Sequence, residues 1–134
     1  MRAGKVSFEA VVSMSFENAV ARCRELLALE GFGVITEIDV QATMKKKLGV
    51  DVTPYLILGA CHAPSAHRAL TAVPEVGVLL PCNVTVSVEG GATVVRAMNP
   101  IVVLGMVAEP SLAEVGLGVA TALKRVVGGC EQAG

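Results

Sequence analysis

The sequence predicts an α+β domain in which helices cover one face of a mainly antiparallel sheet. Apolar residues recur at helical spacing within residues 16–30 and 112–126, which is typical of amphipathic helices. Between these segments, short runs rich in β-branched residues are separated by turn residues such as Glu89-Gly90-Gly91. The chain has 134 residues, a length that suits one domain, residues 1–134, around one hydrophobic core.

The first expected elements are a strand, a helix and a second strand. Residues 5–12 are rich in valine and form the first strand. Ser15 is a favourable N-cap for the helix that follows, and Gly31 supplies its left-handed end. Cys23 lies on the apolar side of this helix, where a free cysteine usually packs. Residues 32–38 then form the second strand.

A short helix and a third strand lead to the first cysteine segment. Asp39 caps this helix, which runs through Leu48 and ends at Gly49. The lysines at 45–47 complement the helix dipole, and they indicate a solvated helix end because no glycine-rich phosphate loop accompanies them. Residues 55–58 form a short apolar strand.

Proline residues shape the second half of the chain. Pro64 suits the first turn of a helix that runs to about Leu70, because proline lacks an N–H group and has a preset φ. Residues 76–80 and 83–88 are expected to form one long or bulged strand. Residues 93–98 pair back with this strand as a hairpin.

The C-terminal part holds one ambiguous segment and one clear helix. Residues 101–107 are apolar without a clear period, so a buried strand, a helix turn and a dimer interface all remain open. Ser111 begins a capping-box pattern that predicts a final helix, which Gly128 and Gly129 are expected to end. Cys130 would then lie in a mobile tail from about residue 128, with an incidental thiol.

Composition restricts the possible partners. Hydrophobic residues make up 53% and charged residues 17%, so a monomer has few polar groups to cover its surface, and we expect a homodimer. The net charge of −1 provides no field to attract phosphates. Aromatic residues are only 3%, without tryptophan, so no stacking platform for single strands exists. We therefore expect no nucleic-acid partner.

The chain also lacks the patterns of export and membrane insertion. Its N-terminus has no signal-peptide pattern, and no apolar run reaches the length of about 18 residues that a membrane span needs. We expect no membrane partner and a cytoplasmic location. In that compartment the four cysteines, Cys23, Cys61, Cys82 and Cys130, are expected to be reduced. Their spacing contains no CxxC pair.

Reactive side chains concentrate in two short segments, residues 59–64 and 79–83, each of which places a cysteine beside a proline. Cys61 is expected just before a helix N-terminus, where unpaired N–H groups and the helix dipole favour a thiolate. His62 could add positive charge there. Cys61 is therefore the candidate nucleophile toward disulfides, persulfides or electrophiles.

Three interpretations of Cys61 and Cys82 remain open. In the first, both are small apolar residues at strand ends. In the second, Cys82 is the resolving thiol for a nucleophilic Cys61. In the third, both bind zinc or copper(I) together with His62 or His67. We favour a dimeric protein that binds a small molecule or metal at these cysteines. The alternatives are a thiol or sulfur-metabolism enzyme or carrier, and a structural dimerisation or regulatory module.

Six motifs carry a further signal: EGFGV at 30–34, EIDVQAT at 37–43, LGV at 48–50, YLILGAC at 55–61, AHRAL at 66–70 and LLPCNV at 79–84. In these motifs the chain resembles family 302 of the bacterial and archaeal domains of unknown function. The resemblance implies a TATA-box-binding-protein-like β-α-β4-α fold, often dimeric, with no established activity or cofactor. It also implies a common pocket, whose expected residues are Asp39, Gln41, Cys61, Arg68, Cys82 and Asn83. We expect His62 to line the same pocket.

Two positions depart from the pattern of that family. The family usually has Cys-Asn-Pro where this chain has Cys61-His62-Ala63-Pro64, which replaces an amide by an imidazole beside the thiol. It usually has Asp-Pro where this chain has Asn99-Pro100. The second change removes a carboxylate, and with it any acid or base role that the aspartate has in relatives.

Overall fold

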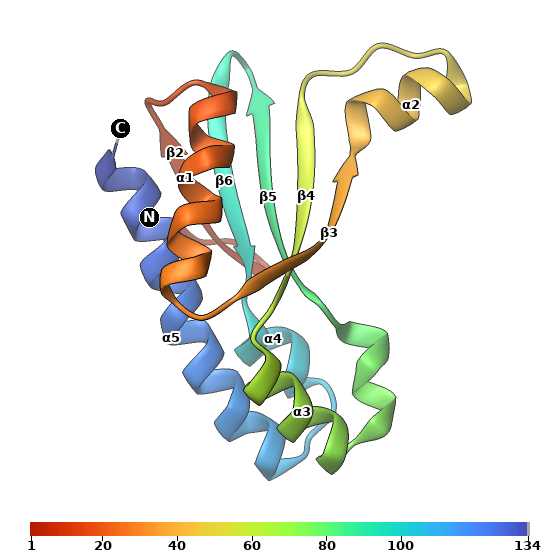
Figure 1. Ribbon diagram of the computed structural model, residues 1–134, viewed down its shortest axis with the longest axis vertical. Coiled ribbons are helices and arrows are strands. Elements are labelled where there is room, and N and C mark those ends of the chain that lie inside the picture. The colour runs from red at the N-terminus through yellow and green to blue at the C-terminus, as the bar shows by residue number, and fades with distance from the viewer. Residues whose placement is uncertain (134) are drawn as a thin grey trace.

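The computed structural model describes residues 1–133, which form a six-stranded antiparallel sheet with α1 and α5 packed on one face (Figure 1). The strand order is β1-β2-β6-β5-β4-β3. The strands are β1 (Arg2–Ala3), β2 (Ser7–Val12), β3 (Gly33–Asp39), β4 (Tyr55–Cys61), β5 (Cys82–Glu89) and β6 (Ala92–Met98). The helices are α1 (Phe16–Leu29), α2 (Val40–Leu48), α3 (Ala63–Ala72), α4 (Pro100–Gly105) and α5 (Pro110–Ala133), with a 3₁₀ helix at Pro74–Leu79.

This architecture confirms the α+β class and the antiparallel sheet. Without β1 and the inserted helices, the element order is β2-α1-β3-β4-β5-β6-α5, which is the expected β-α-β4-α arrangement. Helix α2 lies apart from α1 and α5, beyond the end of β3 (Figure 1). Among the helices of the described residues, none is long and apolar enough to cross a membrane.

The helix-facing side of the sheet forms the core. Along β2, Phe8, Ala10 and Val12 alternate with outward residues, as the two-residue period of a strand requires. Ala10 pairs with Val95 of β6, and both side chains are buried. Lys124 of α5 places its ammonium group 5.2 Å from the centre of the Phe8 ring, so α5 covers this part of the sheet.

The opposite face of the sheet carries an ion network around Arg96. Its Nε donates to Glu9 at 2.7 Å, and its Nη1 donates to Glu89 at 2.5 Å. The Arg96 hydrogen bond, followed by one from Ser87, lowers the pKa of Glu89 to about 2. These carboxylates are therefore ionised at neutral pH, and this part of the uncovered face is polar.

The expected caps of the first two helices are confirmed. The Ser15 hydroxyl accepts a hydrogen bond from the Asn18 amide at 3.1 Å, at the start of α1. Asp39 Oδ1 accepts from the Ala42 amide at 2.9 Å, at the start of α2. Gly49 ends α2 with a φ of +68°, a conformation that favours glycine.

The expected strand at residues 76–80 is wrong, because residues 74–79 form a 3₁₀ helix. Pro74 stands in its first turn, and Val76 alone within this helix is buried while Val78 is 84% exposed. Residues 101–107, for which a helix turn was one option, begin in α4 and continue as a turn. In both segments, the short apolar run in the sequence did not distinguish a strand from a helical turn.

The expected end of the last helix at Gly128 and Gly129 is also wrong. Helix α5 continues to Ala133, so residues after 128 belong to the helix and not to a separate tail. A Cβ atom at Gly129 would lie 2.8 Å from Leu26 Cδ1, so glycine here allows α5 to approach α1 closely. Cys130 is completely buried in this contact.

Gly59 permits the close approach of the three strands beside the candidate site. A Cβ atom at Gly59 would lie 2.0 Å from Thr36 Oγ1 on β3 and 3.0 Å from Pro81 Cγ. The pairing of β3 with β4 also shifts between Val34 and Thr36, at an irregularity that resembles a β-bulge. A methyl group at position 59 would therefore displace the Thr36 hydroxyl, and it would also crowd Pro81 Cγ and, at 3.3 Å, Thr36 Cβ.

We predict that Gly59→Ala lowers the free energy of unfolding by about 1–3 kcal/mol, because a methyl group overpacks this junction. Urea denaturation followed by circular dichroism measures the change. Gly33→Ala is the matched control on β3, because no atom lies within 4 Å of the Cβ position there. Equal stability of the two variants would contradict the close-approach explanation.

Candidate functional site

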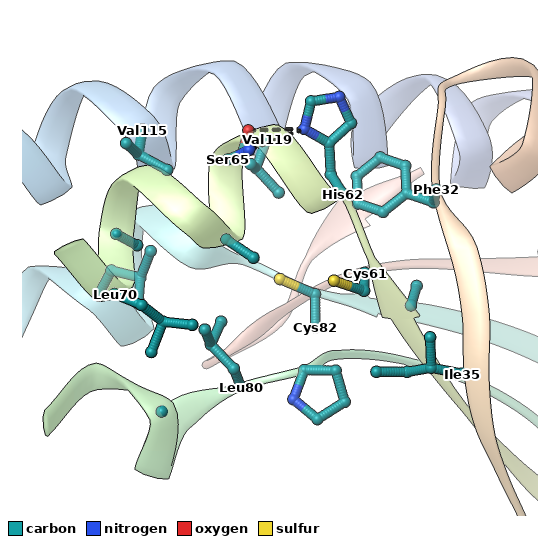
Figure 2. Close-up of a pocket in the computed structure, with 16 residues that line it drawn as sticks. Phe32, Ile35, Cys61, His62, Ser65, Leu70, Leu80, Cys82, Val115 and Val119 are labelled. Atoms are coloured by element: carbon teal, nitrogen blue, oxygen red, sulfur yellow. Dashed lines mark hydrogen bonds between the residues drawn. The ribbon is translucent and has the colours of Figure 1, made fainter. Parts of the chain in front are cut away.

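A largely apolar pocket of about 310 Å³ brings together Cys61, His62 and Cys82 (Figure 2). The end of β4, helix α3 and the segment before β5 form its sides. Val115 and Val119 of α5 complete the wall. Two cysteines from separate sequence segments therefore face one pocket, an arrangement that their positions in the sequence left open.

Cys61 is the last residue of β4 and stands immediately before α3. Its side chain is half-buried, and Figure 2 shows its sulfur atom directed into the pocket. Pro64 occupies the first turn of α3, as predicted. The thiol therefore lies one residue before the N-cap of α3.

His62 is the N-cap of α3. The Ser65 amide donates to its Nδ1 at 3.3 Å, and the Ser65 hydroxyl lies 2.7 Å from the same atom (Figure 2). Because Nδ1 accepts a hydrogen bond, the proton of the neutral ring is on Nε2. The ring also packs against Phe32, with 5.5 Å between the ring centres. These contacts fix the imidazole at the pocket wall.

Cys82 is buried at the start of β5, opposite Ala60 of β4. Burial raises the pKa of its thiol to about 11, and the nearby charge of Cys61 acts in the same direction. The Cys82 thiol is therefore protonated at neutral pH. In this state it offers a weak hydrogen-bond donor and a polarizable sulfur to a molecule in the pocket.

The other four expected site residues lie outside the pocket. Asp39 caps α2, and Gln41 donates to the Val52 carbonyl at 3.0 Å. Arg68 is exposed on α3, 3.9 Å from Glu114 of α5, and Asn83 is exposed on β5. The structure thus unites Cys61, His62 and Cys82 and leaves the other four apart from them.

The three-ligand arrangement expected for zinc or copper(I) is not assembled. Across residues 1–133, no group of three or more histidine, cysteine, aspartate or glutamate side chains could hold a metal ion. His62 uses Nδ1 for the helix cap, and His67 is exposed on α3. The donor set of a tetrahedral site therefore does not form.

Sequence reasoning missed the contributions of Ser65 and Phe32 to the pocket. The signal for Ser65 was its position three residues after the His62 cap, where a cap side chain meets a backbone amide. Phe32 gave no local signal, because its contact with His62 depends on how the loop before β3 folds back. The remaining lining side chains are mostly aliphatic and were indistinguishable from core residues.

The fold and this pocket define a class of protein: a small α+β domain with a six-stranded antiparallel sheet and an apolar cavity lined by two thiols. A family model described as "Domain of unknown function DUF302" matches residues 8–129, and the chain belongs to this family. A search of curated proteins finds no match.

A solved structure is similar over nearly the whole chain. It is described as the crystal structure of uncharacterized conserved protein DUF302 from Bacillus stearothermophilus. The two sequences are 30% identical, the TM-score is 0.88, and the match covers 95% of this chain and 99% of the other.

We predict that Cys82 reacts slowly with iodoacetamide in the folded protein. With its pKa raised to about 11, the reactive thiolate becomes abundant only as the pH rises toward that value. At pH 8 its alkylation should be roughly 100-fold slower than in urea-unfolded protein, where the pKa is about 8.5. Peptide mass spectrometry measures both rates. Equal alkylation rates in folded and unfolded protein would contradict the burial of the Cys82 thiol.

Proposed function

We propose that this protein binds a small, largely apolar molecule in the pocket that contains Cys61 and Cys82. The observation that carries this proposal is the convergence of two thiols and a fixed imidazole on one cavity of about 310 Å³. This volume lies near the lower end of the range for small-molecule sites. Aliphatic side chains, among them Leu70 on α3, Leu104 on α4 and Val115 on α5, line most of the cavity, which suits an apolar ligand.

The polar groups of the pocket restrict the chemistry of the ligand. Figure 2 shows the Nε2 edge of the His62 ring turned away from the two sulfur atoms, and a Cβ atom at Gly31 would lie 3.5 Å from Nε2, so the ring contributes a wall and not a donor to the cavity. The two thiols suit polarizable or weakly polar groups. The ligand class is therefore an apolar molecule with a polarizable or weakly polar group beside the two thiols.

A second candidate function is thiol chemistry at Cys61. The half-buried position of Cys61 at the pocket, one residue before the N-cap of α3, supports this function, because reactive cysteines are partly exposed and often lie near helix N-termini. Cys82 would act as the resolving thiol. In this case Cys61 should alkylate faster in the folded than in the unfolded protein at pH 7, and a well-folded Cys61→Ser variant should lose that fast phase. Slow labelling of Cys61 would reject this function.

We also propose a two-fold homodimer, in the cytoplasm, formed through α2 and β3. None of the nine residues of α2 is buried, although a helix in a soluble domain normally packs one side. Strand β3 is the last strand of the sheet order and has an unpaired edge. Ile35, Ile38 and Leu48 are 62%, 49% and 68% exposed, and a second copy would cover them.

For the ligand site, we predict that Ala66→Leu weakens the binding of anilinonaphthalene sulfonate by at least about tenfold, because leucine fills the pocket. Fluorescence titration of the folded protein measures the affinity. Ala63→Leu is the matched control, since Ala63 is exposed on the same helix and does not line the pocket. Unchanged binding by the Ala66 variant would reject the pocket as the ligand site.

For the dimer, we predict that Leu48→Glu shifts the protein to a monomer at micromolar concentration, because it places a charge in the proposed contact. Sedimentation equilibrium measures the mass. The control is Val78→Glu, which changes a residue that is 84% exposed on the 3₁₀ helix. A dimer that survives Leu48→Glu and Ile35→Glu together, or a monomeric wild type, would reject this interface.

A further inference from the structure

A second pair of thiols lies between α1 and α5, away from the pocket. The Sγ atoms of Cys23 and Cys130 are 3.5 Å apart, and both residues are completely buried. They are separated by 107 positions in the sequence. A disulfide needs the sulfur atoms to approach to about 2.05 Å, so a movement of about 1.5 Å would join them.

We propose that Cys23 and Cys130 form a redox-active dithiol that reacts with small hydroperoxides and closes to a disulfide between α1 and α5. This site is independent of the proposed ligand pocket, because neither cysteine lines it. It also gives Cys130 a role, where the sequence indicated an incidental thiol.

The two thiols are electrostatically unequal. A hydrogen bond from Cys23 lowers the pKa of Cys130 and outweighs the opposing effect of burial, and the nearby positive charge of Arg22 acts in the same direction. The same hydrogen bond, together with burial, raises the pKa of Cys23. Cys130 is therefore the nucleophile, and Cys23 is the proton donor and the resolving thiol.

Arg22 offers a further group for an anion at this position. Its buried Nε atom has no hydrogen-bond partner within residues 1–133, while its Nη1 donates to Glu25 at 3.1 Å. A buried, unpaired N–H group of a guanidinium is costly. The Cys130 thiolate, or the oxygen of an oxidised sulfur, would lie in the field of this cation.

The reaction balances with hydrogen peroxide as the oxidant. The Cys130 thiolate attacks one peroxide oxygen, an S–O bond forms, the O–O bond breaks, and the leaving hydroxide takes a proton to become water. The Cys23 sulfur then attacks the Cys130 sulfur, an S–S bond forms, and the S–O bond breaks with release of a second water. Two thiols lose two electrons, and the peroxide gains them.

Local opening at the end of α5 gives the oxidant access. Gly128 and Gly129 directly precede Cys130, and glycine lowers the intrinsic stability of a helix. Cys130 lies in the last turn of α5, and helix ends open more readily than helix centres. A small hydroperoxide therefore reaches Cys130 without global unfolding.

The test treats the reduced, folded protein with a small excess of hydrogen peroxide at pH 7.5 and analyses non-reduced peptides by mass spectrometry. We expect a Cys23–Cys130 linked peptide, an unchanged far-ultraviolet spectrum and a melting temperature at least about 5 °C higher, because the bond closes a long loop. Dithiothreitol should reverse the mass change and the temperature shift.

Variants make the test decisive. In Cys23→Ser, which keeps a hydroxyl donor beside Cys130 but lacks the resolving thiol, Cys130 should accumulate as a sulfenic acid that dimedone labels. The double variant Cys61→Ala, Cys82→Ala removes the pocket thiols and should still form the Cys23–Cys130 bond at the wild-type rate. The proposal is overturned if Cys23 and Cys130 stay reduced under these conditions, or if their linkage forms only at the rate of global unfolding.

Discussion

Packing of the apolar side of α5 is the interaction on which the rest of the structure depends. This helix contacts β2 and β6 of the sheet and also α1, α3 and α4. Its buried residues are Leu112, Val115, Gly116, Val119, Ala120, Ala122, Leu123, Val126, Val127 and Cys130. Because α1 and α5 cover only one face of the sheet, the core would open if α5 moved. The same helix supplies the pocket wall and one thiol of the dithiol, so both candidate sites depend on its position.

The elements that local chemistry determines were predictable, and those that distant contacts determine were not. Caps such as Asp39 act through a neighbouring amide, and their signal lies within a few residues. The glycines at 128 and 129 gave an equally clear signal for a helix end, but the contact with Leu26 on α1 outweighed it. Tertiary packing of this kind overrides helix propensity because burial of a helix face contributes more than one unfavourable residue costs.

The candidate site shows the same division. The sequence placed Cys61 and Cys82 at strand ends but left open whether they lie close together, because that depends on how β4 pairs with β5. The two departures from the family pattern are explained by capping, since His62 caps α3 and Asn99 caps α4 with its Oδ1 atom 3.0 Å from the Ile101 amide. Asparagine and aspartate, which the resemblance implies for relatives at these positions, are strong caps as well. The substitutions thus preserve helix starts, which weakens a catalytic interpretation of either position.

The two pairs of cysteines differ in their exposure and in the pKa values of their thiols. Cys61 in the pocket is half-buried, but burial keeps the pKa of Cys82 high. The pair between α1 and α5 is closed to bulk solvent, yet the Cys23 hydrogen bond and the Arg22 charge favour a thiolate at Cys130. Cysteine spacing along the chain carries no information about either environment, because both are created by contacts between distant elements. The same residue type therefore suits ligand contact at one place and redox chemistry at the other, and only the surrounding charges and helix ends decide between them.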